Sequence, residues 1–209
     1  MIEKDLSAFL PAIWKTKAIS YPEYQTLHAQ WVQEESSSAG ADHPDMAHYT
    51  KLNLQRMHRL EKTFVPSLPW SDIFTAVDQP ADWLVLTETW CGDAAQNIPL
   101  LEKVIEGQPH IRTMYLWRDQ NLELMDAFLT RGGRSIPKVI FTDRETGKVR
   151  GSWGPRPAAA DAVFMELKAK HGTDYTPIVT AMQQWYNQDK GVSFENDFRE
   201  SILHAYGRK

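Results

Sequence analysis

Cysteine is almost absent from this 209-residue chain, which contains a single one, Cys91. One cysteine excludes an internal disulfide and is typical of a protein from a reducing compartment. Long apolar runs are also missing, because none approaches the roughly 20 residues that a membrane span requires. The N-terminus lacks the basic start and apolar core of a secretory signal. These absences predict a cytoplasmic protein that does not cross a membrane.

An excess of positive charge is missing as well. The chain has 23 Lys and Arg against 27 Asp and Glu, a net charge of −4 and a pI near 6.0, so nothing indicates nucleic-acid binding. The seven histidines do not have the spacing of metal ligands beside cysteines or paired carboxylates. Gly132-Gly133 is not followed by the Gly-Lys-Ser/Thr of a phosphate loop. We therefore expect no bound metal and no bound cofactor.

The most informative stretch is Trp90-Cys91-Gly92-Asp93-Ala94. It follows an apolar run at 83–87 and opens a helical pattern at 94–106. A thiol at a strand-to-helix junction faces backbone N–H groups and the positive end of the helix dipole, which stabilise the thiolate. The plain alternative is that Cys91 is a small buried apolar residue. Asp93 opposes thiolate formation by like charge, although it is also a favourable first-turn helix residue.

Hydrophobic periodicity predicts helices up to residue 66 and then an alternation of strands and helices. Helices are expected within 1–35, including one that starts at Tyr21, and over 46–63. A strand–helix–strand order predicts a parallel pair, and the last two strands are close enough for an antiparallel hairpin. The later elements are expected at 71–77 (helix), 83–87 and 111–117 (strands), 121–129 (helix), 138–142 and 148–153 (strands), and 158–170, 177–188 and 193–206 (helices). The basic side of the 46–63 helix is interpreted as a solvated face formed by Lys51, Arg56, Arg59 and Lys62.

Several marks, in their order, resemble the thioredoxin fold over residues 72–170. Trp90-Cys91-Gly92 is similar to the start of the Trp-Cys-Gly-Pro-Cys signature of thioredoxins, and Gly133-Arg134-Ser135-Ile136-Pro137 resembles the loop that carries their cis-proline. The other marks are Pro99, Asp119-Gln120-Asn121 and Gly154. The outer helices, with 50–57 and 185–190, resemble those of a bacterial thioredoxin-like family of longer proteins. The resemblance implies an α/β thioredoxin fold with an N-terminal helical extension (1–66), a thioredoxin-like domain (67–170) and a C-terminal helical extension that packs on the core (171–209).

The same resemblance implies thiol–disulfide exchange through Cys91. Pro137 would shape a substrate groove, and the backbone of Ile136 would pair with an extended substrate segment. Trp90 would form an apolar wall, and Gly92 would allow close backbone approach. Arg134, with Arg131, either meets the carboxylates of a glutathione-like partner or is simply a solvated loop arginine.

Two departures from the family pattern limit this chemistry. Ala94 stands where thioredoxins have their resolving cysteine, and Val85 stands where they have a buried acid. Glu88 is either a substitute proton acceptor or a surface residue at the end of a strand.

With one thiol, exchange stops at the mixed disulfide, and release requires an external thiol such as glutathione. The leading hypothesis is therefore a monothiol protein that acts on protein or small-molecule disulfides. The alternatives are a binding or chaperone-like module without redox turnover, and peroxide sensing through a sulfenic acid. The oligomeric state is not predicted.

Overall fold

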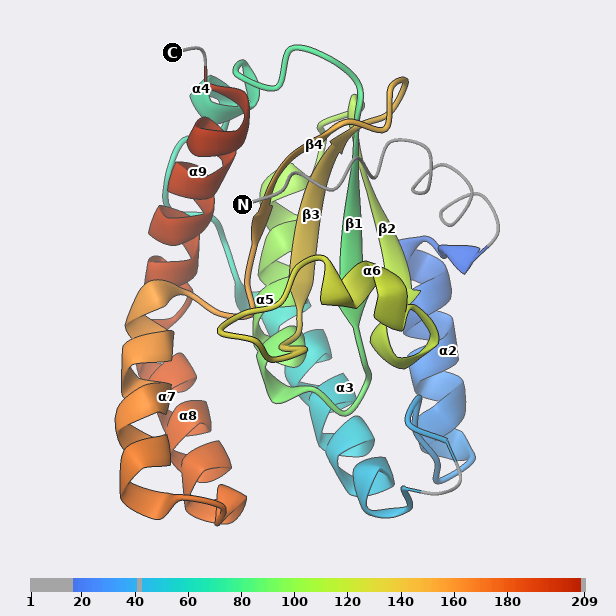
Figure 1. Ribbon diagram of the computed structural model, residues 1–209, viewed down its shortest axis with the longest axis vertical. Helices are drawn as coiled ribbons and strands as arrows, with labels where there is room; N and C mark the ends of the chain where they lie inside the picture. Colours follow the sequence, from blue (N-terminus) through green and yellow to red (C-terminus); the bar gives the residue numbers. More distant parts are fainter. Residues whose placement is uncertain (1–16, 41–42, 208–209) are drawn as a thin grey trace.

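The computed structural model describes residues 17–40 and 43–207 of the chain. The apolar pattern of Leu6, Phe9, Leu10, Ile13 and Trp14, on which the first expected helix rests, lies outside these ranges. Within them, eight α-helices and four strands form one α/β arrangement (Figure 1).

A four-stranded sheet lies at the centre, in the order β2-β1-β3-β4. Strand β1 (Ala81–Thr87) runs parallel to β2 (Ile111–Trp117) and antiparallel to β3 (Lys138–Asp143), which pairs antiparallel with β4 (Val149–Trp153). The predicted parallel pair and the predicted hairpin are both confirmed. All seven residues of β1 are buried, as expected of a central strand covered on both faces.

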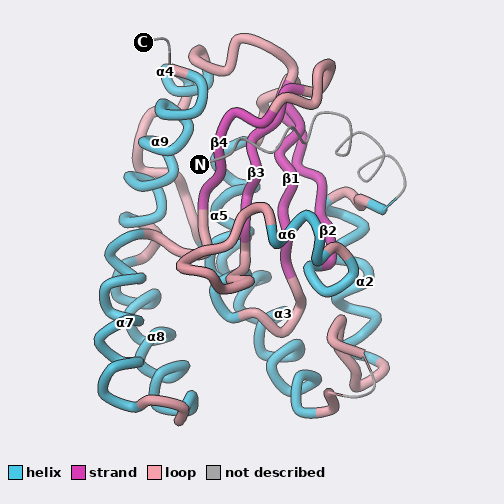
Figure 2. Tube along the Cα trace, viewed as in Figure 1, coloured by secondary structure: helices cyan, strands magenta, loops and turns pink. Residues whose placement is uncertain are grey.

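The helices surround this sheet (Figure 2). Helix α5 (Gly92–Ile105) connects β1 to β2 and packs against α3 (Asp45–Thr63). Helix α2 (Tyr21–Gln33) begins at a capping box formed by Ser20 and Glu23, at the residue that the sequence predicts. The remaining helices are α4 (Ser71–Phe74), η1 (Arg118–Gln120), α6 (Leu122–Asp126), α7 (Ala158–His171), α8 (Tyr175–Asp189) and α9 (Val192–Tyr206).

Helix α6 is shorter than the helix predicted over 121–129. The backbones of Thr130 and Gly133 exchange two hydrogen bonds of 2.9 Å, and the turn between them places Arg131 at φ 50° and Gly132 at φ 79°. Positive φ values cannot continue a right-handed helix. Helix α6 itself ends earlier, at Asp126, so Phe128 and Leu129 of the predicted helix lie in the segment that leads to this turn.

The C-terminal helix α9 is part of the main core. Phe198 is fully buried, and its ring meets a cluster of aromatic rings from the sheet and its flanks. Those rings belong to Trp70, Trp83, Phe141, Trp153 and Phe194. Helices α7 and α8 instead share a small apolar cluster of their own and extend past the end of the sheet (Figure 1).

Candidate thiol site

Cys91 lies at the strand-to-helix junction that the sequence predicts. It caps the N-terminus of α5, where the backbone N–H of Ala94 donates to its Sγ at 3.4 Å. The thiol in turn donates to the carbonyl oxygen of Ile136 at 3.3 Å. Only 8% of Cys91 is exposed. The helix start therefore holds the sulfur, but the surrounding chain covers it.

The surroundings of Cys91 favour the protonated thiol. Burial, and then the nearby carboxylate of Asp93, raise the pKa of Cys91 to about 12, while the Ala94 N–H and the charge of Arg156 act in the opposite direction. Desolvation of the thiolate thus outweighs the helix dipole. The expectation that this junction stabilises a thiolate is not met in the structure.

Asp93 does more than begin a helix. Its Oδ2 accepts a hydrogen bond from Arg156 Nε at 3.0 Å, and its Oδ1 accepts one from the Tyr186 hydroxyl at 2.6 Å. Arg156 precedes α7 and also pairs with Asp161 at 3.3 Å. Because Tyr186 belongs to α8, this one carboxylate fastens α8 and the chain leading into α7 to the start of α5.

The loop that resembles the cis-proline loop lies directly against the thiol. The Ile136–Pro137 peptide bond is cis, and both residues are buried. Lys138 ties this loop to Gly154, because its ammonium group donates to the Gly154 carbonyl at 2.9 Å. The carbonyl of Ile136, one of the groups expected to pair with a substrate backbone, accepts the Cys91 thiol instead.

Glu88 is fully buried, so its interpretation as a surface residue is wrong. Its carboxylate accepts hydrogen bonds from the backbone N–H of Asp119 at 2.9 Å and from the hydroxyl of Ser38. Burial raises the pKa of Glu88 to about 7. These two contacts join the loop before α3 and the turn after β2 to the end of β1. Neither leads to the Cys91 thiol, so the structure gives no support to Glu88 as its proton acceptor.

Comparison with known proteins identifies the family. The family model described as thioredoxin matches residues 41–171, well over half of the chain. The chain belongs to the thioredoxin family. The crystal structure of an HIV epitope scaffold is similar, with 18% identity, 91% of this chain and 100% of that chain covered, and a TM-score of 0.52. A protein of unknown function from Pseudomonas aeruginosa shows 22% identity, coverage of 85% and 98%, and a TM-score of 0.46. No curated protein matches the chain.

The other residues expected at the thioredoxin site are engaged elsewhere. Arg134 forms two hydrogen bonds with Asp126, at 2.7 and 2.8 Å, and Arg131 pairs with Asp161. Neither arginine is therefore held ready for a ligand carboxylate. Trp90 is half-buried, and the guanidinium of Arg118 lies over its ring. The Arg118 Cζ atom is 4.9 Å from the centroid of the Trp90 ring.

Helix α3 contributes a polar face to this thioredoxin site that the sequence interpretation missed. Thr50 and Asn53 are fully buried, and Asn53 Nδ2 donates to the Thr89 carbonyl at 2.9 Å. Thr50 Oγ1 lies 3.1 Å from Thr89 Oγ1, and Arg56 Nη1 donates to Asn53 Oδ1 at 2.7 Å. Residues 50, 53 and 56 repeat every three positions, which places them along one helix face. The three-residue spacing could have revealed this polar face in the sequence, but the neighbouring basic residues led to its interpretation as a solvated face.

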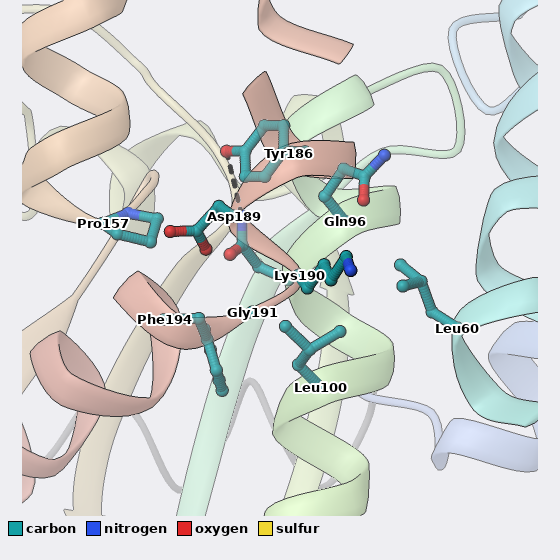
Figure 3. Close-up of a pocket in the computed structure, with 10 residues that line it drawn as sticks. Leu60, Gln96, Leu100, Pro157, Tyr186, Asp189, Lys190, Gly191 and Phe194 are labelled. Atoms are coloured by element: carbon teal, nitrogen blue, oxygen red, sulfur yellow. Dashed lines mark hydrogen bonds between the residues drawn. The ribbon is translucent and has the colours of Figure 1, made fainter. Parts of the chain in front are cut away.

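A small cavity lies beside the middle of α5 (Figure 3). Its volume of about 20 Å³ is enclosed by Asn97 and Leu100 of α5, Tyr186 of α8, and Phe194 of α9. This is roughly the space of one water molecule and is too small for an organic ligand. In the described ranges, no three His, Cys, Asp or Glu side chains are grouped as metal ligands, and no helix is long and apolar enough to span a membrane.

Proposed function

We propose that this thioredoxin-family protein is a binding protein whose single thiol rests protonated and performs no redox turnover of its own. The observation that supports this proposal most directly is the position of the Cys91 thiol. The thiol is buried and donates a hydrogen bond to the carbonyl oxygen of Ile136, a group expected to pair with a substrate.

The chemistry of disulfide exchange explains why this position matters. The attacking species is the thiolate, which must also reach the substrate sulfur. Because burial raises the pKa of Cys91 far above neutral pH, very little thiolate is present at pH 7. Ala94, which is 1% exposed, stands where a resolving cysteine would complete a turnover. A fold that retains the site but lacks a second thiol is suited to binding.

The second candidate is monothiol exchange with protein or small-molecule disulfides. The Ala94 N–H and the charge of Arg156 both favour a thiolate at Cys91, and they support this alternative. The thiolate would attack a disulfide to form a mixed disulfide and release one thiolate. An external thiolate, such as that of glutathione, would then attack that mixed disulfide and release Cys91. Either step requires the sulfur to become exposed first.

Incubation of the folded protein with glutathione disulfide separates the two functions. The binding proposal predicts no glutathione adduct on Cys91 by intact-mass spectrometry at pH 7.5, and adduct formation once guanidinium unfolds the chain. It also predicts that the wild type and Cys91→Ser are indistinguishable in a glutathione-coupled disulfide reduction assay. An adduct on the folded protein, with activity that Cys91→Ser abolishes, would establish monothiol exchange and overturn the binding proposal.

A further inference from the structure

We infer that a small carboxylate binds between α3 and α8 at the bare backbone of Gly92, held by Arg56 and Gln183. This inference rests on the proposed binding function and names the class of its ligand. Arg56 belongs to the face that the sequence analysis interpreted as solvated, and Gln183 lies in the C-terminal extension.

Arg56 carries a charge that the described part of the chain does not compensate. Its guanidinium is half-buried, and its hydrogen bond is to a neutral acceptor, Asn53 Oδ1, at 2.7 Å. No carboxylate of a described residue lies within the 4.0 Å of an ion pair with it. Burial and then the neighbouring Arg59 lower the pKa of Arg56, as expected of a cation that lacks a counter-charge. A half-buried cation of this kind gains stability when an anion arrives.

The Arg56 side chain is also held in place. Asn53, its partner, is fully buried and bonded through Nδ2 to the carbonyl of Thr89. Thr89 lies in the turn between β1 and α5, immediately before Trp90. The guanidinium is therefore fixed relative to the thiol site, and this preorganisation lowers the entropy cost of binding a ligand there.

Gln183 directs a second donor to the same point. Its Oε1 accepts a hydrogen bond from the buried Gln96 at 2.7 Å, which leaves its Nε2 on the side of Gly92. A Cβ atom placed on Gly92 would lie 3.4 Å from Gln183 Nε2 and 4.0 Å from Arg56 Nη1. Figure 3 shows Gln96 on α5 beside Tyr186 of α8, on the side where the two helices meet.

The arrangement selects a carboxylate of small size. Two N–H donors from different helices converge at Gly92, and a carboxylate has two oxygens to accept from them. Asp93, the next residue, does not neutralise the site, because Arg156 and Tyr186 occupy its oxygens. Gly92 itself is half-buried, with Gln183 and Arg56 as the side chains nearest to the position of a Cβ atom.

Acetate and acetamide form a matched pair of probes, since they share a shape and differ in charge. We would titrate each into ¹⁵N-labelled protein at constant ionic strength and follow the Gly92 amide resonance. The site predicts a saturable shift with acetate and none with acetamide. Arg56→Gln should weaken acetate binding about tenfold or more, because it removes the charged donor, whereas Arg56→Lys should retain part of it.

Two further variants keep the test decisive if Arg56→Gln perturbs folding. Gly92→Ala places a methyl group at the binding point without changing any charge, and it should abolish the acetate shift of the neighbouring Asp93 amide. Arg59→Gln, on the exposed surface of α3, should leave binding unchanged. Equal shifts with acetate and acetamide, or equal losses in Arg56→Gln and Arg59→Gln, would overturn the inference. Because this titration does not depend on thiol reactivity, its failure is distinct from the appearance of redox turnover at Cys91.

Discussion

Replacement of Asp93 by Asn tests how α8 and the chain before α7 are held to the start of α5. Asp93 accepts hydrogen bonds from Arg156 and from Tyr186, which join it to the chain before α7 and to α8. Asparagine keeps the shape and one acceptor oxygen but removes the negative charge. We expect two effects, a loss of stability and a lower pKa for Cys91, since the Asp93 charge is the second cause of its raised value.

The size of the stability loss follows from the burial of the pair. The Arg156 and Asp93 side chains are 11% and 15% exposed. Removing one partner of a buried ion pair costs about 3–5 kcal/mol. Asp161, at 3.3 Å from Arg156, still compensates part of the charge, so we expect the lower end of this range, about 3 kcal/mol. For a chain of this length, that corresponds to a fall in Tm of about 6–12 °C.

Urea unfolding monitored by tryptophan fluorescence measures the loss, with Asp126→Asn as a matched control. Asp126 pairs with Arg134 on the surface, where both side chains are nearly half exposed, so its replacement should cost less than about 1 kcal/mol. Alkylation of Cys91 by iodoacetamide at pH 8 should be faster in Asp93→Asn than in the wild type. Equal stability losses in the two variants, or slower alkylation in Asp93→Asn, would refute the role assigned to Asp93.

Three further substitutions test other parts of the structure. Because burial raises the pKa of Glu88 from 4.5 to about 7, the folded state resists its ionisation, so the free energy of unfolding should fall by roughly 3 kcal/mol as pH rises across that interval. Glu88→Gln should remove this component in urea titrations at pH 4.5 and 8, and an unchanged pH dependence would disprove it. Gly154→Ala should prevent stable folding, as judged by circular dichroism. Gly154 has a φ of +109°, and a Cβ atom on it would lie 2.2 Å from the carbonyl oxygen of Pro137. Gly92→Ala, whose Cβ atom would make only ordinary contacts, should fold normally. Phe198→Ala should lower the free energy of unfolding by about 3–5 kcal/mol in thermal and urea unfolding. Leu203 is 45% exposed on the same helix, so Leu203→Ala should lower it by less than about 1 kcal/mol. Similar losses in the two variants would contradict the placement of Phe198 in the core.

The strands and most helices followed from local pattern. The limits of β2 were predicted to the residue, because strand periodicity and flanking turn residues coincide there. The start of α2 was predicted from Tyr21-Pro22-Glu23, because proline is favoured in the first turn of a helix. Helix α6 was predicted too long, because the apolar residues Phe128 and Leu129 continue the pattern after the helix ends at Asp126.

The site was only partly predictable, for a physical reason. Cys91, Ile136 and Pro137 were brought together as the thioredoxin resemblance implied. The hydrogen bonds at Asp93 depend on residues far along the chain, since Tyr186 reaches it from α8 and Arg156 from the chain before α7. The burial of the Cys91 sulfur, which raises its pKa, likewise has no signature in local sequence. The environment of Arg56 was hidden for the same reason, because α3 turns it toward Gly92.

The central claim is that Cys91 rests as a buried, protonated thiol. Its alkylation rate in the folded protein, measured from pH 6 to pH 10 against that of free cysteine, tests this most directly. The structure predicts a rate that is far below that of free cysteine and still rises at pH 10, which indicates an apparent pKa well above the roughly 8.5 of an unperturbed thiol. A rate that reaches its plateau below pH 8.5 would contradict the account and establish Cys91 as a poised thiolate.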